Sequence, residues 1–242
     1  MKSWDVVSDV LKLLVSNVKP GITTQELNDI GEKRVIELGA IPINKGYHPK
    51  WANSPFPAAV CISVNDEIAH GIPSERKLEN GDTIILDIGV KKDGICGDAA
   101  LTVGVGEISN RDDRLLRHAK MTLEEGIRHI RPGVKLKELA RLMQTFALQR
   151  GYIINYRFCG HFIGKEMHEE PMIPHVTWPG LGEQELKVGD MFCLEPILTY
   201  KDKFGVPVND WVVKTTDGKK AAMFESQILV TDDGCQVLTT HI

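Results

Sequence analysis

The sequence predicts an α+β fold in which helices cover one face of a curved, mostly antiparallel sheet. Two observations lead to this prediction. An order of two helices followed by strands occurs twice along the 242 residues. Residues 81–87 and 189–195 also resemble each other, because each has a polar turn, an apolar strand and a final carboxylate, Asp87 or Glu195. A buried acid is costly unless something pairs with it, so we expect both strands to direct their acids at a shared centre.

The similarity between the halves extends beyond these strands. Lys19-Pro20-Gly21-Ile22 reappears 112 residues later as Arg131-Pro132-Gly133-Val134, and the offset is 108 residues at the acid-bearing strands. We therefore expect one domain over residues 1–242, with pseudo-two-fold symmetry between halves at about 5–105 and 112–232. The alternative is chance similarity between two Pro-Gly turns and two apolar strands.

The first half begins with apolar residues at helical spacing from Val6 to Val18, and the Pro-Gly pair ends this helix. A second helix is expected over 24–38, with Thr24 as N-cap and Gly39 as its stop. Four prolines make residues 42–57 irregular. Strands are expected at about 58–64, 83–90 and 95–104.

The second half repeats this plan. Helices are expected at about 112–130 and 135–150, followed by strands near 152–158 and 190–198. The last two strands, about 208–216 and 219–231, are joined at Asp217-Gly218, which is a strong hairpin signal.

Composition narrows the classes of function. Hydrophobic residues make up 42% and charged residues 26%, as in ordinary globular proteins. No apolar run reaches the roughly 18 residues that span a bilayer, and the N-terminus predicts an amphipathic helix rather than a secretion signal. These features predict a cytoplasmic protein. A net charge of −4 argues against a nucleic-acid partner, and five scattered cysteines without a CxxC pair indicate no disulfide framework.

Five residues in strand contexts carry the expected chemistry. Asp98 follows Asp87 by eleven residues across a polar turn, so a hairpin can place both carboxylates on one face. His161 lies between glycines. Glu195 ends its apolar strand, and Glu225 lies within another apolar strand. A single strand acid is usually a solvated edge residue, but four carboxylates and one imidazole together would repel one another if merely buried. Two divalent ions would neutralise them, and oxygen-rich ligation with one histidine suits Mn, Fe, Co or Zn.

Longer motifs around these residues identify a family. CISVNDEIAHGIP (61–73), GDTIILDIGV with Asp98 (81–98), GHFIGKEMHEEP (160–171), CLEPIL (193–198) and DWVVKTTDGKKAAMFE (210–225) resemble the type I methionine aminopeptidases of the pita-bread metallopeptidase superfamily. The resemblance covers almost the whole chain. It implies the pita-bread fold, and it implies that the five residues ligate two divalent ions, with Mn, Fe, Co, Ni and Zn all open as their identity.

The resemblance also implies the reaction and further site residues. Water activated by the two ions would hydrolyse the first peptide bond of a protein that begins with methionine, preferring a small second residue. Glu195 would accept the proton, His70 would face the scissile peptide and His168 would contact its carbonyl. The methionine pocket would be lined by Cys61, His70, Met167 and Trp211, with aromatic help from the 47–57 loop, and His168 would also bind the substrate. Alone, either histidine would more often be structural, and His48, His118, His129, His175 and His241 are left as structural or surface residues.

The implied partners are the N-termini of nascent polypeptides and the ribosome surface. The chain has neither the zinc-finger extension of some eukaryotic members nor the helical insertion of type II enzymes. We therefore expect a bacterial-type or organellar-type monomer.

Competing functions stay open at this stage. An Xaa-Pro dipeptidase would need an additional N-terminal domain. A non-catalytic binding module that acts on nascent chains or at the ribosome would be expected to lose ligands, whereas all five are present. A specialised paralogue fits the departures from the family pattern, which are Phe162 in place of glycine, Met167 in place of an aromatic residue, Ser226 in place of histidine, and a long 49–57 loop.

Overall fold

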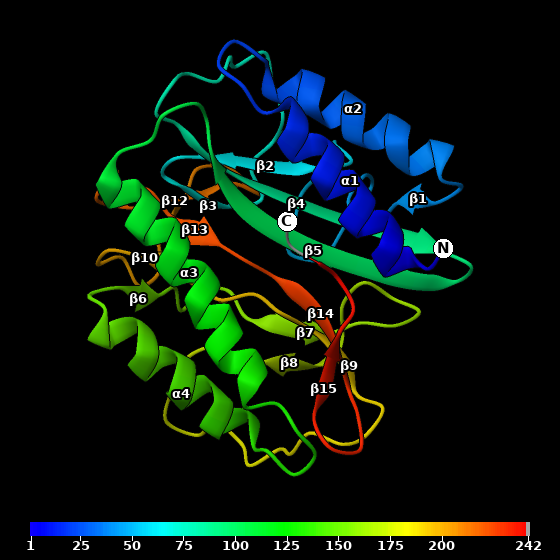
Figure 1. The fold of residues 1–242 in the computed structure, drawn as a ribbon, viewed down its shortest axis with the longest axis vertical. Helices are drawn as coiled ribbons and strands as arrows, with labels where there is room; N and C mark the ends of the chain where they lie inside the picture. The colour runs from blue at the N-terminus through cyan, green and yellow to red at the C-terminus, as the bar shows by residue number, and fades with distance from the viewer. Residues whose placement is uncertain (241–242) are drawn as a thin grey trace.

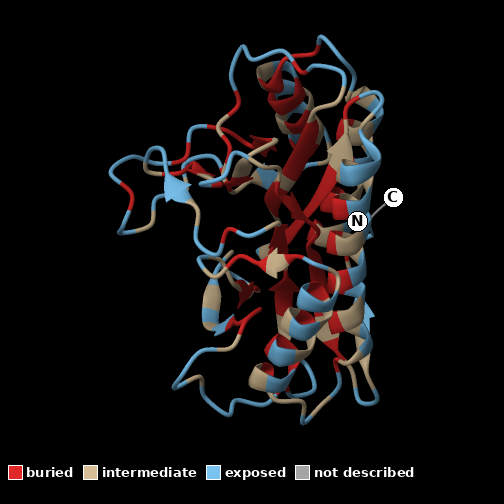
Figure 2. Ribbon diagram, turned by 90° about the vertical axis from the view of Figure 1, so that its left-hand side faces the viewer, coloured by how far each residue is buried: buried red, intermediate tan, exposed pale blue. Residues whose placement is uncertain are grey.

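The computed structural model describes residues 1–240 as an α+β structure with antiparallel strand pairing, which confirms the predicted fold class. Figure 1 shows the four helices in front of the strands, with one pair over each half of the sheets. Figure 2 shows the buried strands behind this helix layer and long loops on the opposite side. The helices are α1 (Ser3–Asn17), α2 (Thr24–Glu37), α3 (Asn110–Arg128) and α4 (Leu136–Gln149).

Two larger sheets supply most of the framework. In the first, the long hairpin of β4 (Thr83–Lys92) and β5 (Ile95–Gly104) is flanked by β2 (Cys61–Val64) and β1 (Ile41–Pro42). The second has the order β15-β14-β9-β7-β8, formed by Cys235–Val237, Ser226–Val230, Met191–Leu194, Gly160–Phe162 and Glu169–Ile173.

Residues 1–240 also form two small sheets of three strands each. In one, β12 (Val213–Lys214) lies between β11 (Val206–Pro207) and β3 (Glu67–Ala69). In the other, β10 (Ile197–Thr199) lies between β13 (Ala222–Met223) and β6 (Ile153–Ile154).

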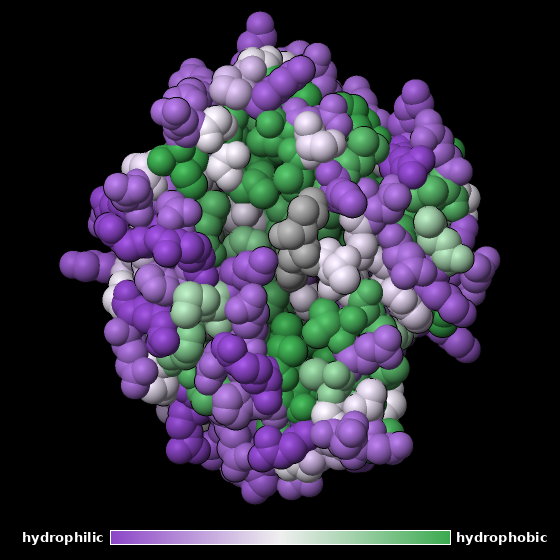
Figure 3. Space-filling view, viewed as in Figure 1, coloured by the Kyte–Doolittle hydropathy of each residue, from purple (hydrophilic) through white to green (hydrophobic). Residues whose placement is uncertain are grey.

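The core lies between the helix layer and the sheets. Helix α1 buries one stripe, formed by Val6, Val7, Val10, Leu11 and Leu14, and it contacts both β4 and β5. Figure 3 shows this face of the molecule, with hydrophilic side chains over its outer part and apolar side chains visible along its middle. No helix within residues 1–240 combines the length and apolar character that a bilayer crossing requires.

Helix α2 begins at Thr24 as expected, but its N-cap differs from the prediction by one residue. Thr23, rather than Thr24, is the N-cap: its hydroxyl accepts the Glu26 N–H at 3.0 Å, and the Glu26 carboxylate accepts the Thr23 N–H at 2.8 Å. This reciprocal pair is a capping box. Thr24 is otherwise engaged, because its hydroxyl donates to the Ser74 carbonyl at 2.9 Å.

Equivalent turns occur in the two halves. Gly21 N–H donates to Leu78 O, and Leu78 N–H donates to Ile22 O. In the second half, Gly133 N–H donates to Leu186 O and Leu186 N–H donates to Val134 O. These contacts reproduce the sequence offsets of 112 and 108 residues. The two turns therefore have the same hydrogen-bond pattern, and the pseudo-symmetry of the two halves stays a prediction.

The prediction of a hairpin at Asp217-Gly218 is wrong. A local turn exists there, with the Thr215 hydroxyl bonded to Lys219 O, but the flanking strands do not pair with each other. Strand β12 pairs with β3, and β13 pairs with β10. Both flanking segments also bond to the turn at 65–66, so long-range partners take the hydrogen bonds that a hairpin would have made.

Several predicted strands are shorter than expected. Those at 58–64 and 208–216 form only at Cys61–Val64 and Val213–Lys214, and the one at 219–231 divides into Ala222–Met223 and Ser226–Val230. Two others differ for local reasons. The strand expected over 152–158 forms only at 153–154, because the Asn155 side chain accepts the Arg157 N–H and starts a turn. The strand expected over 190–198 divides into β9 and β10 at Pro196, a residue without an N–H to donate.

Asn28 generates a stability prediction. Its side chain on α2 is buried, and its Oδ1 accepts the N–H groups of Ala59 and Val60 at 2.9 and 3.2 Å, just before β2. Asn28→Ala leaves both N–H groups buried without that acceptor, so we expect the free energy of unfolding to fall by about 2–4 kcal/mol. Urea denaturation in EDTA measures this loss. The matched control is Asn17→Ala, at the partly exposed end of α1, and equal losses in both variants would contradict the assignment.

Candidate metal centre and peptide pocket

One cavity of about 560 Å³ collects the residues that the sequence analysis selected. Strands from both large sheets and loops from the side away from the helices contribute to its lining. The ten predicted site residues all line it: Cys61, His70, Asp87, Asp98, His161, Met167, His168, Glu195, Trp211 and Glu225. The structure therefore brings together the residues chosen for metal, catalytic and substrate roles.

The β4–β5 hairpin places Asp87 and Asp98 on one face. Asp87 is opposite Ala100 in the ladder, and Asp98 is opposite Gly89, so the two acids form a diagonal pair across adjacent strands. Gly89 leaves room here, because a Cβ atom at this position would lie 2.7 Å from Asn44 Oδ1 and 3.1 Å from Met167 Sδ. The ladder register thus explains why two acids eleven residues apart meet.

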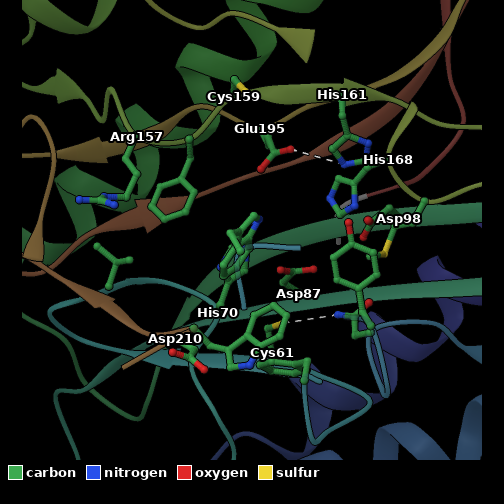
Figure 4. Close-up of a pocket in the computed structure, with 18 of the residues that line it drawn as sticks. Cys61, His70, Asp87, Asp98, Arg157, Cys159, His161, His168, Glu195 and Asp210 are labelled. Carbon is green, nitrogen blue, oxygen red and sulfur yellow. Dashed lines mark hydrogen bonds and ion pairs between the residues drawn. The ribbon is translucent and has the colours of Figure 1, made fainter. Parts of the chain in front are cut away.

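His161 and Glu195 come from the second sheet. His161 on β7 is opposite Cys193 on β9, and Glu195 directly follows β9. His161 Nδ1 lies 3.0 Å from the Phe162 carbonyl, so this nitrogen carries the proton and Nε2 presents its lone pair to the cavity. Nε2 lies 3.7 Å from the nearer Glu195 oxygen. Figure 4 shows the side chains of Glu195, Asp87, Asp98 and His161 around the same space.

Glu225 reaches the centre between β13 and β14. Its N–H donates to Ala100 O at 2.8 Å, which ties it to the strand that carries Asp98. One potential ligand atom from each of Asp98, His161, Glu225 and Cys193 lies within 4.8 Å of the others. These groups come from four different strands or strand ends, which is the arrangement of a metal centre rather than of a surface charge cluster.

Cys193 is a member of this group that the sequence analysis did not select. Side-chain alternation along β9 puts Cys193 on the same face as Glu195, and this was the available signal. Burial, followed by the charges of Glu225 and Asp98, raises the pKa of the thiol well above its ordinary value. Its sulfur is therefore a neutral thiol beside oxygen ligands.

Gln227 connects the two acid-bearing sheets. It is fully buried on β14; its Oε1 accepts the Asp98 N–H, and its Nε2 donates to Cys96 O, both at 3.3 Å. No sequence pattern indicated this role, since the partners are about 130 residues away.

The electrostatics of the centre call for cations. Burial raises the pKa of Asp87 to about 7. Burial and the neighbouring carboxylates raise the pKa values of Asp98, Glu195 and Glu225 well above their ordinary range. Asp98 Oδ1 is also buried without a hydrogen-bond partner among the described residues. Such a group keeps its negative charges only beside positive ones, so the donor set fits divalent metal ions.

The apolar part of the cavity is organised around Trp211. Its ring lies 5.2 Å from Phe56 and 5.1 Å from Trp51, centroid to centroid, and its Nε1–H donates to Ser54 O. The Asn53 backbone and side chain both bond to the Asp210 carboxylate. The long loop is therefore fixed against Trp211, and it supplies the aromatic side chains that the sequence analysis expected.

His70 and His168 stand between the metal centre and this apolar part. The His168 ring lies 4.2 Å from His161 and 5.1 Å from Tyr47, and the His70 ring lies 6.3 Å from Trp211. Burial lowers the pKa of His70 to about 4. Desolvation within the cavity, followed by the neighbouring His161 and His70 rings, lowers the pKa of His168 to about 3. Both rings are neutral at neutral pH, so each can donate one N–H to a substrate.

The four departures from the family pattern divide into two groups. Met167 and two aromatic residues of the loop, Trp51 and Phe56, line the cavity. Phe162 packs on Phe192 with 5.8 Å between ring centroids, and Ser226 is buried opposite Leu194 on β9. Neither of these two is among the described residues that line the cavity.

His175 was not selected, but within residues 1–240 it bonds to a residue of the site, Glu195. It is buried, and its Nε2 accepts the N–H groups of Gly160 and Glu195. His48, His118 and His129 do not line the cavity in the described part of the chain, and His241 lies outside the described residues. Sequence reasoning also missed several lining residues, on loops and on two short strands: Asn44, Arg157, Phe158, Cys159 and Asn209 on loops, Met172 on β8 and Pro207 on β11.

Comparisons with known proteins agree with this geometry. Residues 2–232 match the sequence model of metallopeptidase family M24. It is 38% identical to methionine aminopeptidase 1 of Bacillus subtilis over 227 residues, which are 93% of this chain and 89% of that protein. The crystal structure of methionine aminopeptidase from Rickettsia prowazekii has a TM-score of 0.91 at 31% identity, covering 97% of this chain and 93% of that one.

A more distant structure shares only the fold. The Xaa-Pro dipeptidase from Bacillus anthracis has a TM-score of 0.75 at 22% identity, and the match covers 99% of this chain and 59% of that one. The dipeptidase is thus a considerably longer protein.

The lowered pKa of His70 predicts a pH effect on stability. Between pH 6.5 and about 4, the unfolded chain binds a proton at His70 that the folded protein does not bind. The contribution of His70 to the free energy of unfolding is therefore fully present above pH 6.5. It is lost as the pH falls, by up to about 3 kcal/mol. Because nearby carboxylates titrate as well, the measurement is the difference in unfolding free energy between wild type and His70→Gln in EDTA. As the pH falls from 7 to 4, the unfolding free energy of the wild type should fall relative to that of His70→Gln. Parallel pH profiles would contradict a neutral, half-buried imidazole at His70.

Proposed function

This chain belongs to metallopeptidase family M24 and is a metal-dependent aminopeptidase, and we propose that it removes the initiator methionine from nascent proteins. One observation carries the proposal. Four carboxylates and the His161 imidazole meet at one end of a cavity whose other part is apolar and aromatic. A free α-amino group and a methionine side chain complement these two parts.

The proposed metal ligands are Asp87, Asp98, His161, Glu195 and Glu225, which would hold two divalent ions. Manganese, iron, cobalt, nickel and zinc all suit this donor set. When bound, such ions lower the pKa of a water molecule toward neutrality and polarise the scissile carbonyl.

The chain's own residues would move the protons and orient the peptide. Glu195 would take the proton from the attacking water, because its carboxylate faces the cavity and its raised pKa favours proton uptake. His168, neutral and beside His161, would donate its N–H to the carbonyl oxygen as negative charge develops there. His70 would donate to the peptide nitrogen and assist departure of the amine.

The pocket determines the first residue of the substrate. Cys61, Met167 and Trp211 give it an apolar lining, to which a thioether fits well. An apolar pocket separates near-isosteres by only about 1–3 kcal/mol per methylene. We therefore propose that norleucine is accepted and that bulkier first residues are rejected, with a small second residue preferred.

Other properties follow from this function. We propose that the protein acts in the cytoplasm as a monomer, on N-termini emerging at the ribosome surface. We also propose that residues 1–242 form a single catalytic domain, in which the halves 5–105 and 112–232 contribute acids to a shared centre.

A specialised role within the same reaction is the second candidate. The observation that favours it is that Met167 and the fixed 47–57 loop reach the cavity. A paralogue with a restricted substrate range would change these positions and keep the ligands.

Release of free methionine from Met-Ala-Ser tests the proposed function. Metal-free protein is titrated separately with Mn, Fe(II), Co and Zn, and wild type is compared with Asp98→Asn. We expect metal-dependent release that falls by at least about 100-fold in the variant, since one ligand is lost. Asp93→Asn, in the exposed turn of the same hairpin, is the matched control. Absence of release with every metal would contradict the proposal.

Met167→Phe tests whether Met167 loosens the methionine pocket. A rigid ring in place of a flexible thioether should sharpen selectivity, so the ratio of kcat/KM for methionine over leucine substrates should rise by about 3-fold or more. Peptides that begin with methionine, norleucine and leucine provide the measurement. An unchanged ratio would contradict the role given to Met167.

A further inference from the structure

We propose that His175 is a positioning residue, which fixes the spacing between the strands that present His161 and Glu195 to the metal centre. The inference rests on the proposed function, because it assigns these two residues to that centre. Nothing in the sequence motifs selected His175, and it does not line the cavity.

The strands diverge where the two ligands leave them. The ladder between β7 and β9 pairs Phe162 with Phe192 and His161 with Cys193, and it goes no further. The next N–H groups toward the site belong to Gly160 and Glu195. Both donate to one atom, His175 Nε2, at 3.1 and 3.2 Å. A single imidazole nitrogen therefore bridges the two strands at the point where they separate.

The gap admits an acceptor but no additional side chain. A Cβ atom at Gly160 would lie 2.2 Å from Cys193 O and 3.2 Å from His175 Nε2. His175 follows β8, whose Ile173 is opposite Gly160. The bridge thus comes from a third segment that packs beside both strands.

The hydrogen bonds define the state of the imidazole. Nε2 must be unprotonated to accept two N–H groups, so the proton resides on Nδ1. Nδ1 is buried and has no hydrogen-bond partner among the described residues. Retaining a polar ring with one unsatisfied nitrogen is costly, which argues that the acceptor at Nε2 has a purpose beyond filling space.

Loss of this acceptor has a defined consequence. Two buried N–H groups would lack a partner, and the strands would have to move to satisfy them. One of these N–H groups belongs to Glu195 itself, and the other precedes His161. The positions of both side chains would then become less defined.

Two substitutions separate positioning from packing. His175→Leu fills the space and removes the acceptor, whereas His175→Gln removes the ring and supplies an amide oxygen that can accept both N–H groups. His118→Leu is the matched control, because His118 Nδ1 is likewise buried without a hydrogen-bond partner among the described residues, whereas the bonds to Gly160 and Glu195 are made by His175. The readouts are Mn(II) affinity by calorimetry, hydrogen exchange of the peptides containing Gly160 and Glu195, and kcat and KM for Met-Ala-Ser.

For His175→Leu we expect Mn(II) affinity and kcat to fall by about 10- to 100-fold, as for other partners of metal ligands. Exchange at both amides should accelerate, while KM should change less than about twofold, because the pocket is intact. His175→Gln should restore affinity and kcat to within about threefold of wild type. His118→Leu should leave every readout unchanged.

A folded His175→Leu protein with wild-type affinity and kcat would overturn the proposal. If the leucine variant does not fold, the glutamine variant decides: wild-type behaviour supports the acceptor role, and a loss of affinity and kcat without a change in melting temperature overturns it. Absence of methionine release by the wild type would refute the proposed function instead, and Mn(II) affinity and hydrogen exchange would still test the positioning role.

Discussion

The repulsion among Asp87, Asp98, Glu195 and Glu225 is the constraint on which the rest of this structure depends. These carboxylates come from strands or strand ends in both halves of the chain and face one cavity, where burial raises all four pKa values and neighbouring carboxylates raise those of Asp98, Glu195 and Glu225 further. A structure that holds them together loses free energy unless cations are present. The hydrophobic core and the sheets must therefore supply enough stability to keep the centre assembled for metal.

Several parts of the fold share this task. The β4–β5 ladder fixes two acids as a diagonal pair, and Gln227 ties that ladder to the strand beyond Glu225. The carbonyl of Phe162 orients the His161 ring. On the far side of the cavity, hydrogen bonds from Asn53 and Trp211 hold the long loop in place, so the peptide pocket is attached to the same framework.

Much of this arrangement could be predicted from local patterns. Helical spacing, capping residues and the repeated plan of the two halves located the four helices of residues 1–240, and the repeated turn-strand-acid segment indicated converging carboxylates independently of the family resemblance. The cavity contains every residue selected for it. What could not be predicted depends on partners distant in sequence. The segments around Asp217-Gly218 pair with other strands. The sequence carried no signal for His175, because the two N–H groups that it accepts become neighbours only in the folded sheet.

A calorimetric titration of metal-free protein with Mn(II) at pH 6.5, repeated in two buffers of different ionisation enthalpy, tests the central claim most directly. Because raised pKa values leave the carboxylates partly protonated at this pH, metal binding must displace protons. The account predicts binding of two ions per chain with net proton release, and weaker binding at lower pH. Binding without proton release, or no binding, would contradict the claim that these acids are gathered to hold metal.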